Sequence, residues 1–277
     1  MPARKRQVVF TDLDGTLLDF STYSPVAAQP GLARLRARGV PVVFCSSKTA
    51  GEQRPLRAEL GLADQPFIVE NGSAIIVPAG CELPVSDWPE LAGGEPGERV
   101  RVLGRAAADI RQAIMDLEAE LGLELAAFSK LGAARVAELT GLDAAGAARA
   151  VARDFSETLA ANLSADEWRR VEARLASLGL QCRHGGRFHT VTGAGSDKGR
   201  ATNEVAALFR AGWGPLVSVE TVGLGDSAND APLLAAVDRS FLLAHEDGSF
   251  ASIEVPGLVR IARAGGRGWT EAVALLD

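Results

Sequence analysis

The chain has 277 residues, of which 47% are hydrophobic and 23% are charged, and its formal net charge at pH 7 is −6. This composition is typical of a globular protein, and the length predicts either one domain with a sizeable insertion or two domains. The acidic balance argues against a nucleic-acid partner, because a nucleic-acid-binding protein normally carries a basic face.

The sequence gives no sign of export or of a membrane span. Its three cysteines, Cys45, Cys81 and Cys182, are far apart and lack C-x-x-C spacing, so they predict neither a disulfide framework nor a zinc site. The apolar run after the basic N-terminus covers only residues 8–10, which is too short for the core of a signal peptide. No run approaches the roughly 18 apolar residues of a membrane span. We therefore expect a cytoplasmic protein with no membrane partner.

The first third of the chain alternates short apolar runs with helical patterns. Strands are expected at residues 8–10, 40–45, 67–72 and 73–78, and helices at residues 30–39 and 50–61. The turn signal Asn71-Gly72 predicts a hairpin between the last two strands, and Pro55 predicts a break in the second helix. Strand–helix alternation of this kind favours an α/β fold with a mostly parallel sheet.

The middle of the chain has a different pattern. Residues 79–98 are rich in Gly, Pro and acidic residues and predict an exposed linker. A strand at residues 99–104 and several helical segments follow, one of them with a capping box at Ser164 and Glu167, and a hairpin turns at Gly185-Gly186. We expect residues 86–190 to form a separate α+β unit.

The last third returns to the first pattern. Helices are expected at residues 197–212 and 229–237, and strands at residues 218–225, 239–245 and 258–262. If these strands join those of the first third, residues 1–85 and 191–277 make one α/β core, and residues 86–190 are an insertion into it.

Two carboxylates lie two residues apart directly after the first apolar run, in the segment Asp12-Leu13-Asp14-Gly15-Thr16. Side chains two residues apart on a strand point to the same side, and like charges so close repel each other. The pair therefore favours a bound cation, a shared proton, or two carboxylates with different roles. Taken alone, this segment also fits a capped loop, although the early glycine does not fit an EF-hand loop.

Three more polar segments fall at the end of a predicted strand or the start of a predicted helix, where ligands bind in open α/β sheets. They are Ser46, Lys198 and the segment Gly-Asp-Ser-Ala-Asn-Asp at residues 225–230. The carboxylates Asp12, Asp14, Asp226 and Asp230 form a set of hard oxygen ligands suited to Mg²⁺. With Lys198 and Ser46 beside them, they can surround a phosphoryl group and leave one carboxylate to attack it.

Together these four segments resemble the motifs of the haloacid dehalogenase superfamily of phosphotransferases. The resemblance implies a doubly wound core with an inserted cap, and Mg²⁺ as cofactor. It implies that Asp12 is the nucleophile and Asp14 the general acid/base, and that Ser46 and Lys198 hold the phosphoryl group. It also implies that Asp12 and Asp226 bind Mg²⁺ through their side chains and Asp14 through its backbone carbonyl. Asn229 and Asp230 would then lie just outside the ligands, with Asp230 orienting Lys198 or a water.

The position of the insertion is that of the sugar-phosphatase branch of this superfamily, and segments such as "VAELTGLDAAGAARAVARDFSETL" and "GGRFHTVTGAGSDKGRA" resemble the mannosyl-3-phosphoglycerate phosphatase family. That family hydrolyses mannosyl-3-phosphoglycerate to mannosylglycerate, a compatible solute. The implied partner is a small phosphorylated sugar-glycerate. One departure is Thr158, where related sequences lead us to expect proline.

A substrate with a phosphate, a carboxylate and a hexose needs cations and hydrogen-bonding groups on the cap. Arg187 and His189 are the candidates for the carboxylate or the sugar. Further candidates from the core loops are Lys48, Glu70, Asn71 and Arg267. Two alternatives stay open: a phosphatase of glucosyl-3-phosphoglycerate or another sugar phosphate, and a non-catalytic phosphosugar sensor. The sequence does not determine the oligomeric state.

Overall fold

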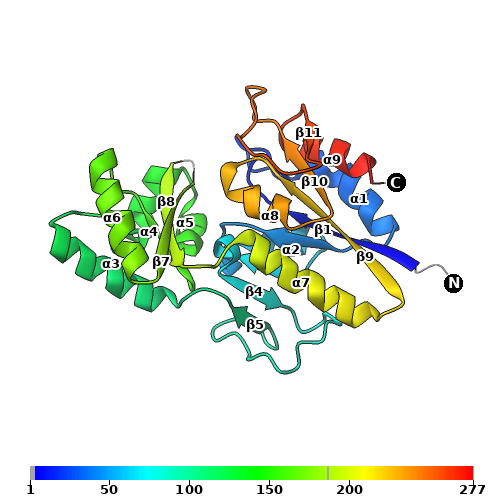
Figure 1. The fold of residues 1–277 in the computed structure, drawn as a ribbon, viewed down its shortest axis with the longest axis horizontal. Coiled ribbons are helices and arrows are strands. Elements are labelled where there is room, and N and C mark those ends of the chain that lie inside the picture. Colours follow the sequence, from blue (N-terminus) through cyan, green and yellow to red (C-terminus); the bar gives the residue numbers. More distant parts are fainter. Residues whose placement is uncertain (1–3, 186, 277) are drawn as a thin grey trace.

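A computed structural model of the chain describes residues 4–185 and 187–276. The described residues form a large α/β core and a smaller cap beside it (Figure 1). None of the described helices has the length and apolar character needed to span a bilayer.

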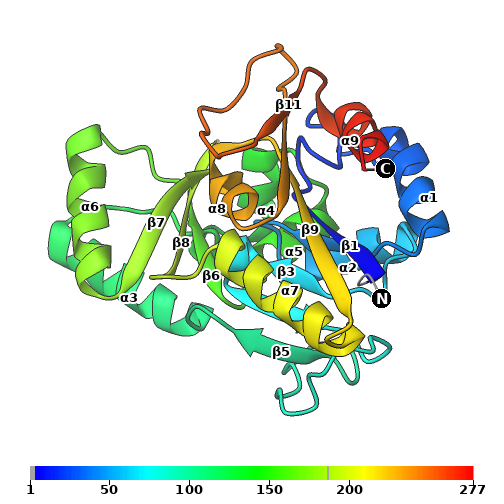
Figure 2. The same cartoon turned by 45° about the vertical axis from the view of Figure 1, so that its right-hand side comes forward.

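The core is built on an eight-stranded sheet with the strand order β11-β10-β9-β1-β2-β3-β4-β5. Six of these strands run parallel, and β4 and β5 form an antiparallel edge. The strands are β1 (Arg4–Thr11), β2 (Val42–Cys45), β3 (Phe67–Val69), β4 (Ala74–Val77), β5 (Arg99–Val102), β9 (Val217–Gly225), β10 (Arg239–Leu243) and β11 (Val259–Ile261). Figure 2 shows β1 and β9 side by side along most of their length.

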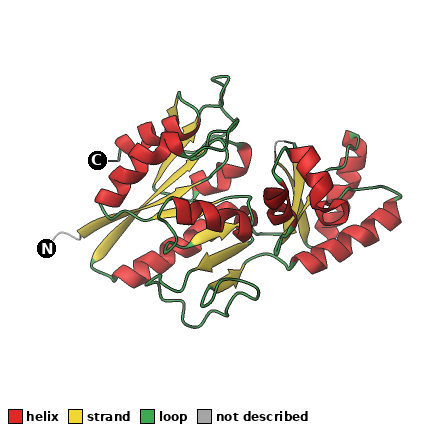
Figure 3. Ribbon diagram, turned by 180° about the vertical axis from the view of Figure 1, so that it is seen from behind, coloured by secondary structure: helices red, strands yellow, loops and turns green. Residues whose placement is uncertain are grey.

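Helices cover both faces of this sheet, which confirms the expected doubly wound architecture (Figure 3). The core helices are α1 (Gln29–Ala37), α2 (Ala50–Glu59), α7 (Lys198–Trp213), α8 (Ala231–Ala235) and α9 (Gly265–Ala274). Val9 of β1 packs in the hydrophobic cluster that contains α1, α2 and α9, whereas Val8 and Phe10 pack in the cluster that contains α7 and α8. A strand buried on both faces needs a continuous apolar run, which is what residues 8–10 supply.

The cap has a three-stranded antiparallel sheet in the order β6-β8-β7. Its elements are α3 (Ala107–Leu121), α4 (Phe128–Thr140), α5 (Ala144–Val151), β6 (Ser156–Leu159), α6 (Ala165–Ser177), β7 (Leu180–Gly185) and β8 (Phe188–Gly193). Apolar residues of α3 and α6 pack on one face of the sheet, against Leu159 and Val191. In Figure 1, α3 and α6 lie on the side of the cap that is away from the core.

The structure differs from the expected course of the chain around residue 86. The strand β5 pairs with β4 in the core sheet, so the chain leaves this sheet only after Val102. The segment expected to be an exposed linker is anchored, because Val85 and Trp88 are buried and Glu98 binds Arg54 at 2.6 Å. The Gly-, Pro- and acid-rich composition begins at residue 79, whereas the chain leaves the core sheet only after Val102.

Several local expectations are confirmed and one is not. The antiparallel pair β3–β4 and the capping box at Ser164 are present. The expected break at Pro55 is absent, because α2 continues through this residue. The β7–β8 hairpin is present, but Gly186 of its expected turn lies outside the described residues.

Candidate active site

Three polar residues lie side by side at one edge of the sheet, because the strands that precede them are adjacent and end at the same level. Thr11 at the end of β1 pairs with Phe44 of β2 on one side and with Leu224 of β9 on the other. Asp12, Ser46 and Asp226 follow these strands directly. Parallel strands place their carboxyl ends at the same edge of a sheet, so chain segments more than two hundred residues apart meet there.

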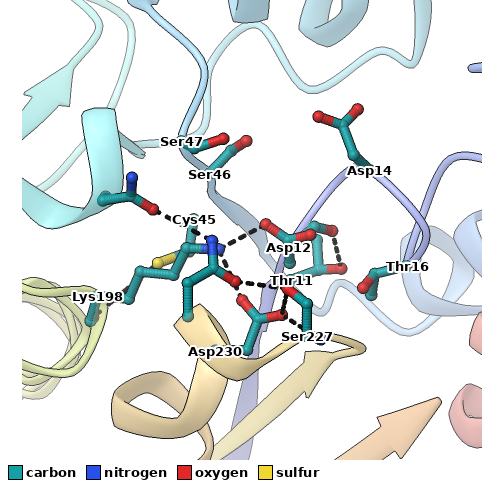
Figure 4. Close-up of polar contacts among 12 residues, drawn as sticks. Thr11, Asp12, Asp14, Thr16, Cys45, Ser46, Ser47, Lys198, Ser227 and Asp230 are labelled. Atoms are coloured by element: carbon teal, nitrogen blue, oxygen red, sulfur yellow. Dashed lines mark hydrogen bonds and ion pairs between the residues drawn. The ribbon is translucent and has the colours of Figure 1, made fainter. Parts of the chain in front are cut away.

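Lys198, the first residue of α7, lies between two of the acidic residues (Figure 4). Its ammonium nitrogen donates to Oδ1 of Asp12 at 2.5 Å and to Oδ1 of Asp230 at 2.6 Å, and its side chain is 1% exposed. Burial by itself would lower the pKa of Lys198, but the carboxylates of Asp12 and Asp230 outweigh burial and raise it. Lys198 is therefore a permanently charged group that fixes the position of Asp12.

Asp230 holds the loop after β9 in place. Its Oδ2 accepts from the backbone N–H groups of Asp226 and Ser227, each at 3.1 Å, while its Oδ1 binds Lys198. Asp226 is held separately, because Thr16 donates its hydroxyl to Oδ1 of Asp226 at 3.0 Å. Both oxygens of Asp230 are thus already used by the protein.

The acidic cluster fits a divalent cation. One carboxylate oxygen each from Asp12, Asp226 and Asp230 lies within 4.8 Å of the others. Burial and the neighbouring Asp230 raise the pKa of Asp12 to about 7, and burial and Asp12 raise the pKa of Asp226 to about 8. One ammonium therefore does not balance the buried carboxylates, and a cation beside Asp12 and Asp226 would do so.

Gly15 allows this close approach of two loops. Its φ of +81° is unfavourable for other residues, and a Cβ at this position would lie 2.5 Å from Oδ2 of Asp226. Any other residue at position 15 would push the Asp12–Thr16 loop away from Asp226.

Asp14 has a different environment from Asp12. Its side chain is 29% exposed, and Oδ2 lies 2.9 Å from the ammonium of Lys48. Its Oδ1 is buried and has no hydrogen-bond partner in the part of the chain that the structure describes. Figure 4 shows Asp14 on the opposite side of Asp12 from Lys198. The two carboxylates are therefore distinct in burial and in partners, which suits two different roles.

The loops that carry Ser46, Asn71 and Asn229 are tied together. Ser46 is buried, and its carbonyl accepts from the backbone N–H of Asn71 at 3.0 Å. The Oδ1 of Asn71, a residue of the short helix η2 (Glu70–Gly72), accepts from Nδ2 of Asn229 in η3 (Ala228–Asp230) at 3.3 Å. Asn71 and Asn229 thus join two loops around the acidic cluster.

Glu70 binds the cap. Its carboxylate accepts from the backbone N–H groups of Asp154 at 3.0 Å and Phe155 at 3.1 Å, and from the hydroxyl of Ser156. Arg153 lies 3.7 Å from the same carboxylate and donates to the carbonyl of Ser47 at 2.7 Å. The partners of Glu70 are thus cap residues, and its predicted substrate contact has no support in this geometry.

Within the described residues, the remaining substrate candidates make no hydrogen bond or ion pair with the acidic cluster. Arg187 is exposed at the β7–β8 hairpin and donates to the carbonyl of Leu139. His189 stacks on Trp168 of α6, with ring centroids 3.6 Å apart, on the helix-covered face of the cap sheet. Arg267 is exposed on α9. Their roles in substrate binding stay predictions.

Some residues at the site were not singled out from the sequence. Arg153 joins the cap to the Ser46 loop, and the Nε2 of His245 lies 3.0 Å from the carbonyl oxygen of Asp226. Trp269 donates its indole N–H to the hydroxyl of Thr11 at 2.9 Å, directly before Asp12. The sequence predicted no role at the site for these residues, and contacts between segments far apart in the chain bring them there.

Comparison with known proteins identifies a family of hydrolases. A family model described as haloacid dehalogenase-like hydrolase matches residues 9–82. A curated protein of Persephonella marina named glucosyl-3-phosphoglycerate/mannosyl-3-phosphoglycerate phosphatase is 35% identical, over 96% of this chain and 95% of its own length. The chain belongs to the haloacid dehalogenase-like hydrolases. A protein of the same name from Methanococcoides burtonii is 33% identical, over 97% of this chain and 96% of its own length.

Solved structures share the fold at lower identity. A haloacid dehalogenase-like hydrolase from Bacteroides thetaiotaomicron has a TM-score of 0.67 at 13% identity and covers 98% of this chain and all of its own (100%). A protein of Thermoplasma acidophilum has a TM-score of 0.65 at 14% identity and covers 98% of both chains. This haloacid dehalogenase-like hydrolase is therefore a phosphoric monoester hydrolase with the core and cap of its relatives.

Proposed function

We propose that this enzyme hydrolyses mannosyl-3-phosphoglycerate to mannosylglycerate and phosphate, with Mg²⁺ as cofactor. The proposal rests on the similarity to the two glucosyl-3-phosphoglycerate/mannosyl-3-phosphoglycerate phosphatases, which extends over nearly the whole chain and includes the cap. Because those relatives are named for the glucosyl as well as the mannosyl compound, glucosyl-3-phosphoglycerate is the second candidate substrate.

The donor set around Asp12 suits Mg²⁺. Asp12 and Asp226 would hold the ion through their side chains, together with the backbone carbonyl of Asp14. When bound there, Mg²⁺ offsets the negative charge of the carboxylates and of the phosphate, which keeps Asp12 ionised. Asp230 would not be a ligand, since its oxygens bind Lys198 and the loop amides.

Asp12 is the proposed nucleophile. An oxygen of its carboxylate attacks the phosphorus and forms an aspartyl-phosphate, while the bond from phosphorus to the substrate oxygen breaks. Asp14 gives a proton to that leaving oxygen. Asp14 then takes a proton from water, whose oxygen attacks the phosphorus, and phosphate leaves as the Asp12 carboxylate is restored. Lys198 and Ser46 hold the transferring group.

The test is phosphate release from mannosyl- and glucosyl-3-phosphoglycerate, sucrose phosphate, trehalose phosphate and p-nitrophenyl phosphate, each with Mg²⁺ and with EDTA. We expect the highest kcat/KM with mannosyl-3-phosphoglycerate and no turnover in EDTA. A higher kcat/KM with the glucosyl compound selects the second candidate, and preference for a phosphate without a glycerate carboxylate overturns the proposal.

A further inference from the structure

The inner face of the cap sheet carries two rows of polar side chains that cross its three strands. Directly opposed residues of antiparallel strands share a face. Ser156 of β6 pairs with Thr192 of β8, which pairs with Gln181 of β7, and these three form the first row. One step further along the strands, Thr158 pairs with Thr190, which pairs with Arg183, and these form the second row.

Each side chain of the first row has a hydrogen-bond partner. Gln181 donates to the hydroxyl of Thr192 at 3.0 Å and also to the carbonyl of Ser196, and Ser156 donates to Glu70 of the core. These contacts fix the cap to the core. They also show that this face, and not the face under α3 and α6, is turned towards the catalytic loops.

The second row has no such partners. Within residues 4–185 and 187–276, neither the guanidinium of Arg183 nor the hydroxyls of Thr158 and Thr190 have a hydrogen-bond or ion-pair partner. Yet Thr158 is buried, and Arg183 and Thr190 are only partly exposed. A charged donor that is partly shielded from water and has no acceptor suits a ligand that supplies one.

The strand that carries Arg183 also contacts the core. The strand β7, which carries Arg183, is in contact with η3, the segment that carries Asn229 and Asp230. The two lysines of the site are already paired, Lys198 with Asp12 and Asp230, and Lys48 with Asp14. A second anionic group on a phosphorylated substrate therefore needs another cation.

We propose that Arg183 binds the carboxylate of the glycerate part of the substrate, and that Thr158 and Thr190 hydrogen-bond to its neighbouring oxygens. This assignment rests on the proposed function. A guanidinium presents two parallel N–H donors that match the two oxygens of a carboxylate, and Arg183 lies on the face of the cap sheet that meets the core loops. Arg183 thereby selects phosphates that carry a carboxylate.

The experiment measures kcat and KM of wild type, Arg183→Ala and Arg183→Lys with mannosyl-3-phosphoglycerate and with p-nitrophenyl phosphate, which has no carboxylate. Arg169→Ala is the matched control, because Arg169 is exposed on α6 at the outer side of the cap and pairs there with Asp166. Loss of a charged hydrogen bond is expected to lower kcat/KM of Arg183→Ala for the phosphoglycerate about 10- to 100-fold, mainly through KM. The loss should be at least about tenfold smaller for p-nitrophenyl phosphate, and partial in Arg183→Lys.

Equal losses with both substrates would indicate a general defect and overturn the assignment, as would an unchanged KM for the phosphoglycerate in Arg183→Ala. Loss of the carboxylate preference in Arg187→Ala, with Arg183→Ala unaffected, would move the site to Arg187 and overturn the assignment too. Failure of the proposed function is distinguishable, because wild type itself would then show no preference for the phosphoglycerate.

Discussion

At the scale of single residues, the charges around Lys198 do not balance. Asp12, Asp226 and Asp230 lie together in a buried space with one ammonium group. Both Asp12 and Asp226 have pKa values above the ordinary 3.8, about 7 and about 8, so folding without a cation favours their protonated forms. Their contribution to stability is fully present below about pH 4 and is lost as the pH rises through 7 to 8.

Mg²⁺ should therefore stabilise the protein more at high pH than at low pH. We expect saturating Mg²⁺ to raise Tm by about 5–10 °C near pH 8.5 and by much less near pH 5.5, where the carboxyls hold protons. Differential scanning fluorimetry with Mg²⁺ and with EDTA measures this. The gain should disappear in Asp226→Asn, and an equal gain at both pH values would contradict the electrostatic explanation.

Asp12→Asn removes the proposed nucleophile and one of the repelling charges. Turnover should fall below about one thousandth of wild type, whereas Tm in EDTA near pH 8.5 should stay the same or rise. Phosphate release and a thermal scan of the same preparation check both parts. Activity that persists would exclude the covalent route through Asp12.

Asp14→Asn should affect substrates according to their need for a proton. With mannosyl-3-phosphoglycerate, whose leaving oxygen is an alkoxide unless protonated, kcat should fall about 10²- to 10⁴-fold. With p-nitrophenyl phosphate the loss should be smaller, since p-nitrophenolate leaves without a proton. Equal kcat losses on both substrates would argue against the acid role of Asp14.

At the scale of elements, the joint between η2 and β6 connects the two parts of the molecule. Glu70 is fully buried, and burial raises its pKa although Arg153 opposes this effect. Its carboxylate accepts from two backbone amides and a hydroxyl at the start of β6. A glycine at position 72 is also required, because a Cβ there would lie 2.1 Å from the carbonyl oxygen of Asp197.

Glu70→Gln should weaken this joint, because it leaves Arg153 without its buried anion and replaces one acceptor by a donor. We expect a loss of about 3 kcal/mol in the free energy of unfolding, measured by urea titration, and faster hydrogen exchange at residues 154–156. The control is Glu90→Gln, an exposed partner of Arg99, which should change stability by less than about 0.5 kcal/mol. Similar losses in the two variants would show that Glu70 does not hold the core and the cap together.

At this scale, the sequence predicts local features of strands but not how one domain faces the other. A short apolar run followed by a carboxylate is a local pattern, so the positions of Asp12 and Asp226 after their strands could be predicted from the sequence. Whether a side chain on a strand faces a second domain depends on residues far away in the sequence. This could not be predicted from a local pattern. Arg187 and Arg183 are both in the predicted hairpin, and only the pairing of Arg183 with Thr190 places Arg183 on the inner face.

At the scale of the whole molecule, the order of motifs predicted a core interrupted by a cap, and the strand order confirms the core. The extent of the core was underestimated, since an edge strand such as β5 alternates like a strand of an α+β unit. The sequence did not predict a role for residues that join core and cap, such as Arg153 and Gln181, because their contacts depend on how the surfaces of the two domains meet.

The insertion of the cap between two halves of the core also has an evolutionary consequence. The carboxylates proposed to react and Lys198 are encoded outside the inserted segment, and the Thr158–Thr190–Arg183 row is encoded within it. On the proposed assignment, mutations that alter the row change which substrate is accepted without altering Asp12, Asp14 or Lys198. Proteins with this architecture can therefore change substrate through mutations in one segment of the gene. Exchange of residues 105–195 between homologues should transfer the substrate preference of the donor protein.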